Sequence, residues 1–209
     1  MIKVERISVM NLENAVRGAR NPMNSWAKID SYYDEKGNYI LGKNDLDLCR
    51  RLACAGPDHR KFLRQIFVSM DITAPLYWWK EFDTYKVATV ANSTSTMHKI
   101  HTKAFSREDF SCDRMSGAAP AAMDALIEVL ESERLAFLET KDRAHWHNII
   151  QLLPSSYNQM RTVTFNYETC VNMYYARRHH KLAEWHSLCD AIAALPYADM
   201  LIMCRAEED

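Results

Sequence analysis

The chain has 209 residues, 48% of them hydrophobic, and its 26 basic side chains nearly balance 27 acidic ones. This length suits one domain with a sizeable core, and the balanced charge gives no overall field that would recruit nucleic acid or an anionic membrane. Charged residues interrupt the N-terminal segment MIKVERISVM where a signal peptide needs an apolar run, and no apolar stretch approaches the length of a membrane span. We therefore expect a cytoplasmic protein with neither a membrane nor a nucleic acid as partner.

The first part of the chain predicts short alternating elements. Residues 2–9 alternate between apolar and polar side chains, which is typical of a strand, and residues 11–20 predict a helix with Asn11 as its N-cap. Gly37 and Asn38 indicate a turn. Two short helices are predicted over 45–56 and 58–65.

The second part predicts one buried strand and longer helices. Residues 65–75 are β-rich and end at Pro75, whereas 106–120 are loop-like. Residues 121–141 hold strong helix formers with no Gly or Pro, and the helical pattern resumes until Pro154. A last helical element is predicted over 167–194 from apolar residues at intervals of three or four: Val171, Tyr174, Leu182, Trp185, Cys189 and Ile192.

Arg178 fills the one gap in this apolar stripe. A guanidinium in such a place needs an anion or access to water, because burying an unpaired charge is prohibitive. The anion is either an internal carboxylate or a ligand group, and the pattern leaves both open.

The segment after the strand is rich in hydroxyl groups. Thr84, Thr89 and the run Ser93–Thr96, with Lys86 and His98, offer donors for an anionic ligand, although a solvated loop explains the same composition. No phosphate-binding loop motif occurs. Trp78 and Trp79 fit either a ligand ring or the core.

Cysteine and histidine spacing gives no sign of a metal or disulfide site. The six cysteines contain no C-x-x-C pair, which favours reduced thiols. His98 and His101, like the His-Trp-His run at 145–147, have ligand-like spacing but no third ligand in a recognised pattern. We therefore expect no metal.

Two segments together resemble flavin-dependent thymidylate synthases. FVSMDITAPLYWWKEFDTYKVAT is similar to the family's strand, Ala-Pro and aromatic helix, so that its signature Arg-His-Arg-x-x-Ser falls on Thr84-Tyr85-Lys86-x-x-Thr89. The region from LLPSSY onward is similar to the family's C-terminal part, with Thr164-x-Asn166 and Ala183-Glu184-Trp185 in place of its Ala-Gln-Trp. The two segments cover roughly a third of the chain.

The resemblance implies a fold, an assembly and an activity. It implies the family's α+β fold (that of thymidylate-synthase-complementing proteins), a central antiparallel or mixed sheet with long helices, as a single domain over 1–209. It also implies a homotetramer with FAD at subunit interfaces, and methylation of the small-molecule nucleotide dUMP to dTMP with methylenetetrahydrofolate and NADPH as cosubstrates.

The resemblance also assigns residues by position. Arg178, aligned through Ala183-Glu184-Trp185, would be the catalytic arginine that polarises the pyrimidine, whereas alignment through Asn166 selects Arg177. The apolar stripe favours Arg178. The expected FAD-binding residues are Tyr85, Lys86, Thr89 and Asn166, and the expected substrate-binding residues are Glu81, Asn92, Ser93, Thr94, Ser95, Thr96 and Arg177.

The departures from the family pattern matter equally. Thr84, Thr96 and Ile150 stand where the family has arginines, Asn92 replaces an acid, Glu81 a glutamine, and Arg64-Gln65 a Glu-His pair. Charge-assisted hydrogen bonds contribute about 1.5–3 kcal/mol each, and micromolar binding needs about 8 kcal/mol. The sequence therefore also allows an altered pyrimidine or acceptor, a non-catalytic nucleotide- or flavin-binding regulatory protein, or an unrelated α+β protein.

Overall fold

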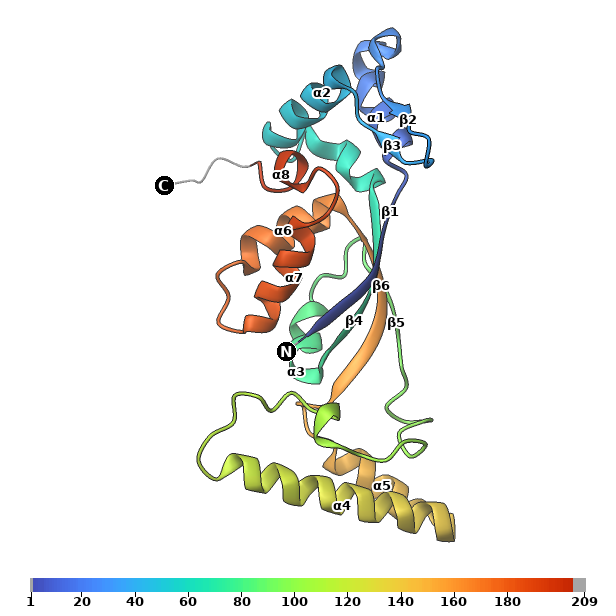
Figure 1. Cartoon of the computed structure of the whole chain (residues 1–209), viewed down its shortest axis with the longest axis vertical. Coiled ribbons are helices and arrows are strands. Elements are labelled where there is room, and N and C mark those ends of the chain that lie inside the picture. Colours follow the sequence, from blue (N-terminus) through green and yellow to red (C-terminus); the bar gives the residue numbers. More distant parts are fainter. Residues whose placement is uncertain (1, 205–209) are drawn as a thin grey trace. The chain divides into compact units, whose positions relative to one another are not determined.

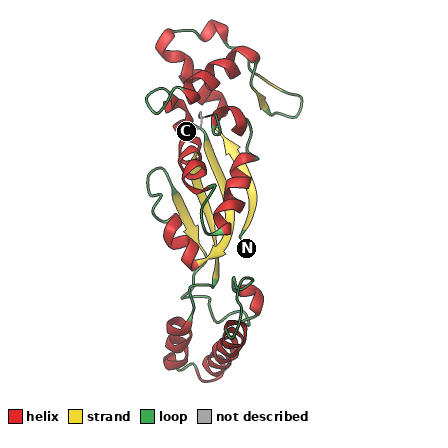
Figure 2. Cartoon of the chain, turned by 90° about the vertical axis from the view of Figure 1, so that its left-hand side faces the viewer, coloured by secondary structure: helices red, strands yellow, loops and turns green. Residues whose placement is uncertain are grey.

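The structure, a computed structural model, describes residues 2–204, which contain both helices and strands (Figures 1 and 2). The strands are β1 (Lys3–Met10), β2 (Tyr32–Tyr33), β3 (Tyr39–Ile40), β4 (Phe67–Pro75), β5 (Val90–Ser93) and β6 (Asn158–Asn166). The helices are α1 (Leu12–Arg20), α2 (Lys43–Cys54), α3 (Leu76–Phe82), α4 (Ala119–Thr140), α5 (Arg143–Leu152), α6 (Tyr167–Arg177), α7 (Ala183–Ala193) and α8 (Ala198–Leu201). Short 3₁₀ turns include η3 (Arg60–Gln65). The predicted α+β class is confirmed.

The main sheet has the strand order β1-β4-β6-β5. The Thr162 side chain of β6 forms a hydrogen bond with Asp71 of β4, and that of Thr164 forms one with Ser69. Residue numbers therefore rise along β6 in the direction in which they fall along β4, so the two strands are antiparallel. Alternate residues of β4 are buried, as the two-residue period of a strand requires: Val68, Met70, Ile72 and Ala74. A separate antiparallel hairpin pairs β2 with β3.

The described chain divides into two compact units. The α4–α5 unit comprises residues 72–84 and 92–161 with Ile2 and Lys3, and the α6–α7 unit comprises residues 4–71, 85–91 and 162–204. The prediction of a single domain over 1–209 stays a prediction.

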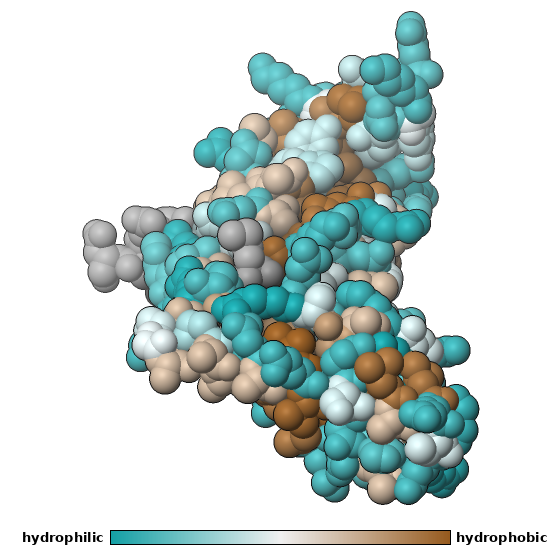
Figure 3. Space-filling view, turned by 60° about the horizontal axis from the view of Figure 1, so that its bottom comes forward, coloured by the Kyte–Doolittle hydropathy of each residue, from teal (hydrophilic) through white to brown (hydrophobic). Residues whose placement is uncertain are grey.

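The α4–α5 unit has its own core, in which the two helices lie side by side. Its buried members are Ile100, Phe105, Phe110, Met123, Leu130 and Ile149. Other apolar side chains of the unit reach the surface, notably Val129, Leu135 and Leu138 of α4. Apolar (brown) side chains lie among hydrophilic (teal) ones in the space-filling view (Figure 3).

The α6–α7 unit packs α6 against both α7 and η3, and α2 against α8. Trp185 and Leu188 of α7, Val171 and Met173 of α6, and Leu63 of η3 are all buried. Within it, Asp45 at the start of α2 is wholly buried and ion-paired to Arg20 at 2.6 Å. This pair ties α1 to α2.

Two local predictions need correction. The single helix predicted over 167–194 is wrong, because α6 ends at Arg177 and α7 begins only at Ala183. Asn11 precedes α1 but adopts a left-handed backbone, φ 68°, and makes no side-chain cap; its amide instead donates to the Gln65 carbonyl. The strands β2, β3, β5 and β6 have no counterpart among the predicted elements.

Among residues 2–204, no helix is long and apolar enough to cross a membrane.

Candidate functional site

An arginine that contacts two neighbouring aromatic rings stands out among the predicted site residues. Arg177, the last residue of α6, donates from Nε to the Tyr85 hydroxyl at 2.9 Å. Its guanidinium carbon lies 4.6 Å from the Trp185 ring centroid and 5.5 Å from that of Tyr85. A planar guanidinium suits such stacking, and the attraction to each ring is about 0.5–2 kcal/mol. One hydrogen bond and two ring contacts, all made by Tyr85 and Trp185, therefore hold Arg177 in place.

Trp185 anchors this cluster. Its ring is fully buried and meets the Tyr85 ring at 5.8 Å with a 61° tilt. The sequence had placed Trp185 in a family motif but not among the site residues. The signal was its place in Ala183-Glu184-Trp185, directly after the turn that follows Arg177.

Arg178 faces different partners. It is the C-cap of α6, and its guanidinium lies 5.1 Å from the Tyr175 ring and 5.9 Å from the Tyr174 ring. Because the helix ends there, the continuous apolar stripe that favoured Arg178 does not exist. Its catalytic role stays a prediction that rests on the alignment alone.

Asn166 joins β6 to α6. It is 4% exposed, and its Oδ1 accepts hydrogen bonds from the backbone N–H and the hydroxyl of Thr169, at 2.9 and 3.1 Å. This is the N-cap arrangement that satisfies the first turn of a helix. A cofactor contact from Asn166 would therefore have to use its Nδ2 amide.

Tyr85, Lys86 and Thr89 come from one segment of the α6–α7 unit, residues 85–91. Lys86 is exposed, so its ammonium is open to an anionic ligand. The Thr89 hydroxyl is buried and has no hydrogen-bond partner among residues 2–204. An unsatisfied buried hydroxyl costs about 1–3 kcal/mol, so a bound group that satisfied it would gain that energy.

Two predicted substrate residues in the α4–α5 unit, Thr94 and Ser95, already make hydrogen bonds to backbone groups of that unit. Thr94 donates to the Met160 carbonyl through both its N–H, at 2.9 Å, and its hydroxyl, at 3.2 Å. The Ser95 hydroxyl accepts the N–H groups of Met97 and His98. The Thr94 hydroxyl therefore helps to join the end of β5 to β6, and the Ser95 hydroxyl stabilises the turn that follows it.

The other predicted substrate residues of this unit are more open. Asn92 and Ser93 are exposed at the end of β5, and Thr96 is half-buried. Glu81 is a half-buried residue of α3, and its carbonyl oxygen accepts from Thr84 at 2.7 Å. All of these assignments stay predictions.

Sequence reasoning missed a charged cluster at the start of α6. Glu168 pairs with Arg60 at 3.3 Å and also with Arg64. Burial alone would raise the pKa of Glu168, but hydrogen bonds and charge from the two arginines outweigh it, so the pKa is lowered. Arg60 is 3% exposed, and its Nη1 lacks a hydrogen-bond partner among residues 2–204. The signal was the four-residue spacing of Arg60 and Arg64.

Metal ligation has no support in the described residues. Within 2–204, no three His, Cys, Asp or Glu side chains lie together in a way that could hold an ion.

Comparison with known proteins places the fold. No protein-family model matches the chain, and no curated protein sequence matches it significantly. Thymidylate synthase X from Helicobacter pylori, crystallised with FAD and dUMP, matches with a TM-score of 0.73 over 98% of this chain and 99% of that chain, at 18% identity. The UMP/dUMP methylase PolB from Streptomyces cacaoi, bound with 5-Br dUMP, matches at 0.63 over 98% and 94%, at 14% identity. The chain therefore has the fold of flavin-dependent thymidylate synthases, which confirms the family-like fold expected from the sequence.

Proposed function

We propose that this protein binds FAD and a pyrimidine deoxynucleotide and methylates the pyrimidine, converting dUMP to dTMP or a close variant of that reaction. Methylenetetrahydrofolate and NADPH would be the cosubstrates. The observation that carries the proposal is the Tyr85–Arg177–Trp185 cluster. Two segments singled out separately in the sequence meet in it, within a chain whose whole length follows a fold that in the Helicobacter pylori protein holds FAD and dUMP.

The residues present fit a flavin nucleotide. A flavin ring needs aromatic contacts, its diphosphate needs a cation, and its hydroxyl and carbonyl groups need hydrogen-bond partners. Tyr85, Lys86 and the unsatisfied Thr89 hydroxyl supply one of each from residues 85–91. When bound, FAD would supply the redox chemistry that reduces the transferred carbon to a methyl group.

Arg177 is the residue we assign to nucleotide recognition. Its contacts with Tyr85 and Trp185 hold the guanidinium in one orientation before any ligand arrives, which lowers the entropy lost on binding. Arg178, which alignment through Ala183-Glu184-Trp185 selects, is proposed as a second hydrogen-bond donor to the pyrimidine. Glu81 and the residues Asn92, Ser93, Thr94, Ser95 and Thr96 are proposed to contact the nucleotide, with Asn166 at the flavin.

We also propose that the protein works as a cytoplasmic homotetramer. Val129 and Leu135 of α4 are 45% and 53% exposed, and apolar side chains on a helix surface gain free energy when another subunit covers them. Sedimentation equilibrium would give the subunit number directly.

The visible absorption spectrum of the purified protein tests the proposal. We expect an oxidised-flavin spectrum after FAD is added and the unbound excess is removed by gel filtration. Adding dUMP should then perturb that spectrum. A complete mixture with both cosubstrates should then yield dTMP, detected by mass spectrometry. If the protein retains no flavin, the flavoenzyme proposal fails.

A non-catalytic binding protein is the second candidate. It is favoured by the hydrogen bonds that the Thr94 and Ser95 hydroxyls already make within the protein, and by Thr84 and Thr96 in place of arginines. Flavin and dUMP binding without dTMP formation would identify this candidate.

A further inference from the structure

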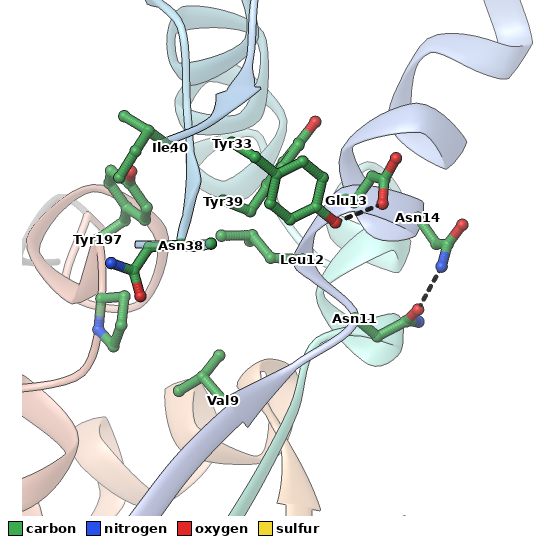
Figure 4. A pocket seen from close by; sticks show the side chains of 12 residues that line it. Val9, Asn11, Leu12, Glu13, Asn14, Tyr33, Asn38, Tyr39, Ile40 and Tyr197 are labelled. Atoms are coloured by element: carbon green, nitrogen blue, oxygen red, sulfur yellow. Dashed lines mark hydrogen bonds between the residues drawn. The ribbon is translucent and has the colours of Figure 1, made fainter. Parts of the chain in front are cut away.

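The α6–α7 unit contains a hollow whose lining includes none of the residues proposed above. It lies between the end of β1, the start of α1, the β2–β3 hairpin and the Pro196–Tyr197 turn, and has a volume of about 820 Å³ (Figure 4). Small-molecule sites typically have volumes of about 300–1,000 Å³. The hollow is therefore large enough for a ring-containing ligand.

The backbone around this hollow turns sharply, and at Tyr197 it is strained. Asn11, Gly37 and Tyr197, all in its lining, have positive φ angles of 68°, 79° and 58°. Such a conformation is ordinary for glycine but costs energy in a residue as bulky as tyrosine. The Tyr197 hydroxyl accepts the Leu41 N–H at 3.0 Å, which holds the turn against the hairpin. Strain of this kind concentrates at ligand sites.

Three polar side chains of the hollow already donate one hydrogen bond each. The Asn14 amide donates to Asn11 Oδ1 at 2.7 Å, and the Tyr33 hydroxyl donates to Glu13 Oε2 at 2.7 Å (Figure 4). The Asn38 amide donates to Asp34 at 2.9 Å. Each of the two amides keeps a second N–H, so Asn14 and Asn38 offer a ligand both an oxygen and a donor, whereas the Glu13 carboxylate only accepts.

Charge and aromatic surface point in the same direction. Glu13 is the one ionisable carboxylate of the lining, which contains no Lys, Arg or His. The hydrogen bond to Glu13 raises the pKa of Tyr33, so this tyrosine stays neutral. Tyr33 is 56% exposed, and its ring meets that of Tyr39 at 5.1 Å. A carboxylate beside exposed aromatic faces attracts a cation both directly and through the rings.

We infer that this hollow binds a planar cationic ligand of the amidinium or guanidinium class. Its N–H groups donate to Glu13 and to the Asn14 or Asn38 oxygens, and its flat part packs against Tyr33. Phosphate-bearing ligands such as FAD and dUMP are disfavoured there, because the lining carries the Glu13 carboxylate and no Lys, Arg or His to offset its repulsion. The site is thus independent of the proposed nucleotide chemistry.

Isothermal titration with three matched probes tests the inference. Benzamidine, benzamide and benzoate share a ring and carry a positive, zero and negative charge. We expect benzamidine to bind with a Kd of about 1 mM or tighter, and benzoate not to bind. Equal binding of benzamidine and benzoate, or no binding of benzamidine, would overturn the proposal.

Variants locate the binding. Glu13→Gln should weaken benzamidine binding about tenfold or more, as the loss of a charge-assisted hydrogen bond predicts. Glu13→Lys should reverse the preference in favour of benzoate. Glu139→Gln removes the same charge from an exposed position on α4 and should change nothing. If Glu139→Gln weakens binding as much as Glu13→Gln, the attraction is to net charge and the assigned site is wrong. Circular dichroism checks that each variant is folded.

Discussion

Arg177 donates from Nε to the Tyr85 hydroxyl at 2.9 Å, although 92 residues separate the two in the sequence. The contact brings the end of α6 against the segment that follows α3. Because Arg177 also stacks on Trp185 at 4.6 Å, its guanidinium plane is set by the protein. Lysine has no planar group to make these contacts.

Arg177→Lys should therefore weaken dUMP binding about tenfold or more while keeping the charge. The same substitution at the next residue, Arg178→Lys, should change dUMP binding less than about threefold. Flavin absorbance titrated with dUMP measures both. The reverse order would assign the nucleotide to Arg178, as alignment through Ala183-Glu184-Trp185 predicts.

The elements with strong local patterns were predicted well. β1, β4 and α4 have clear two-residue alternation, a terminal proline or an unbroken run of helix formers, and the structure has them near the expected bounds. The break between α6 and α7 has no such mark. Residues 178–182 contain neither Gly nor Pro, and the turn is held by hydrogen bonds that a sequence pattern does not reveal, such as that from the Leu182 N–H to His180 Nδ1. β6 was missed because its polar residues Gln159, Arg161 and Thr162 hide the alternation.

The candidate site was predictable in part. Tyr85, Arg177 and Asn166 came from family spacing, and the structure gives Tyr85 and Arg177 a direct contact. The engagement of Thr94 with Met160 was not predictable, because it depends on pairing between strands that were not expected. The hollow beside Glu13 was also invisible, since its lining comes from distant parts of the chain.

Asp45→Asn should lower the free energy of unfolding by about 3–5 kcal/mol at neutral pH, because it leaves the buried Arg20 guanidinium without its counter-charge. Asp45 is fully buried and accepts hydrogen bonds from Arg20, the Ser31 hydroxyl, and the backbone N–H groups of Asp30 and Ser31. Urea denaturation measures the change. Asp47→Asn, an exposed acid on the same helix, is the control and should stay within about 0.5 kcal/mol of wild type.

The same carboxylate should make stability depend on acid. Burial would raise the pKa of Asp45, but its hydrogen bonds from Ser31 and Arg20 outweigh this and lower the pKa below its ordinary 3.8. Its contribution is therefore fully present above pH 3.8 and is lost as pH falls through the lower folded pKa. Unfolding free energies along an acid series should fall less steeply in Asp45→Asn than in wild type. Parallel curves would show that Asp45 titrates alike in both states.

Trp79→Ala should cost about 3–5 kcal/mol of stability. The Trp79 ring is fully buried, and its centroid lies 4.9 Å from that of Trp78 and 5.1 Å from that of Phe82. Its Nε1 donates a hydrogen bond to the Gln159 carbonyl at 2.9 Å. Val87→Ala, at a residue 86% exposed, is the control for a surface change. Unchanged stability with loss of ligand binding would instead make Trp79 a ligand-stacking ring.

Thiol reactivity should separate the cysteines by burial. Burial raises the pKa of Cys49 to about 12 and that of Cys189 to about 11, and it raises the pKa of Cys170 as well. Cys54, exposed at the end of α2, should therefore be alkylated first by iodoacetamide near neutral pH, because the thiolate is the reactive form.

Peptide mass spectrometry after timed alkylation measures each site. In urea all six cysteines should react at similar rates, which shows that the folded structure causes the difference. Alkylation of folded Cys170 as fast as Cys54 would contradict the packing of α6, since Cys170 lies wholly inside that helix's buried face. Slow alkylation of Cys170 with rapid alkylation of Cys54 would support the packing of α6, the helix that also positions Arg177.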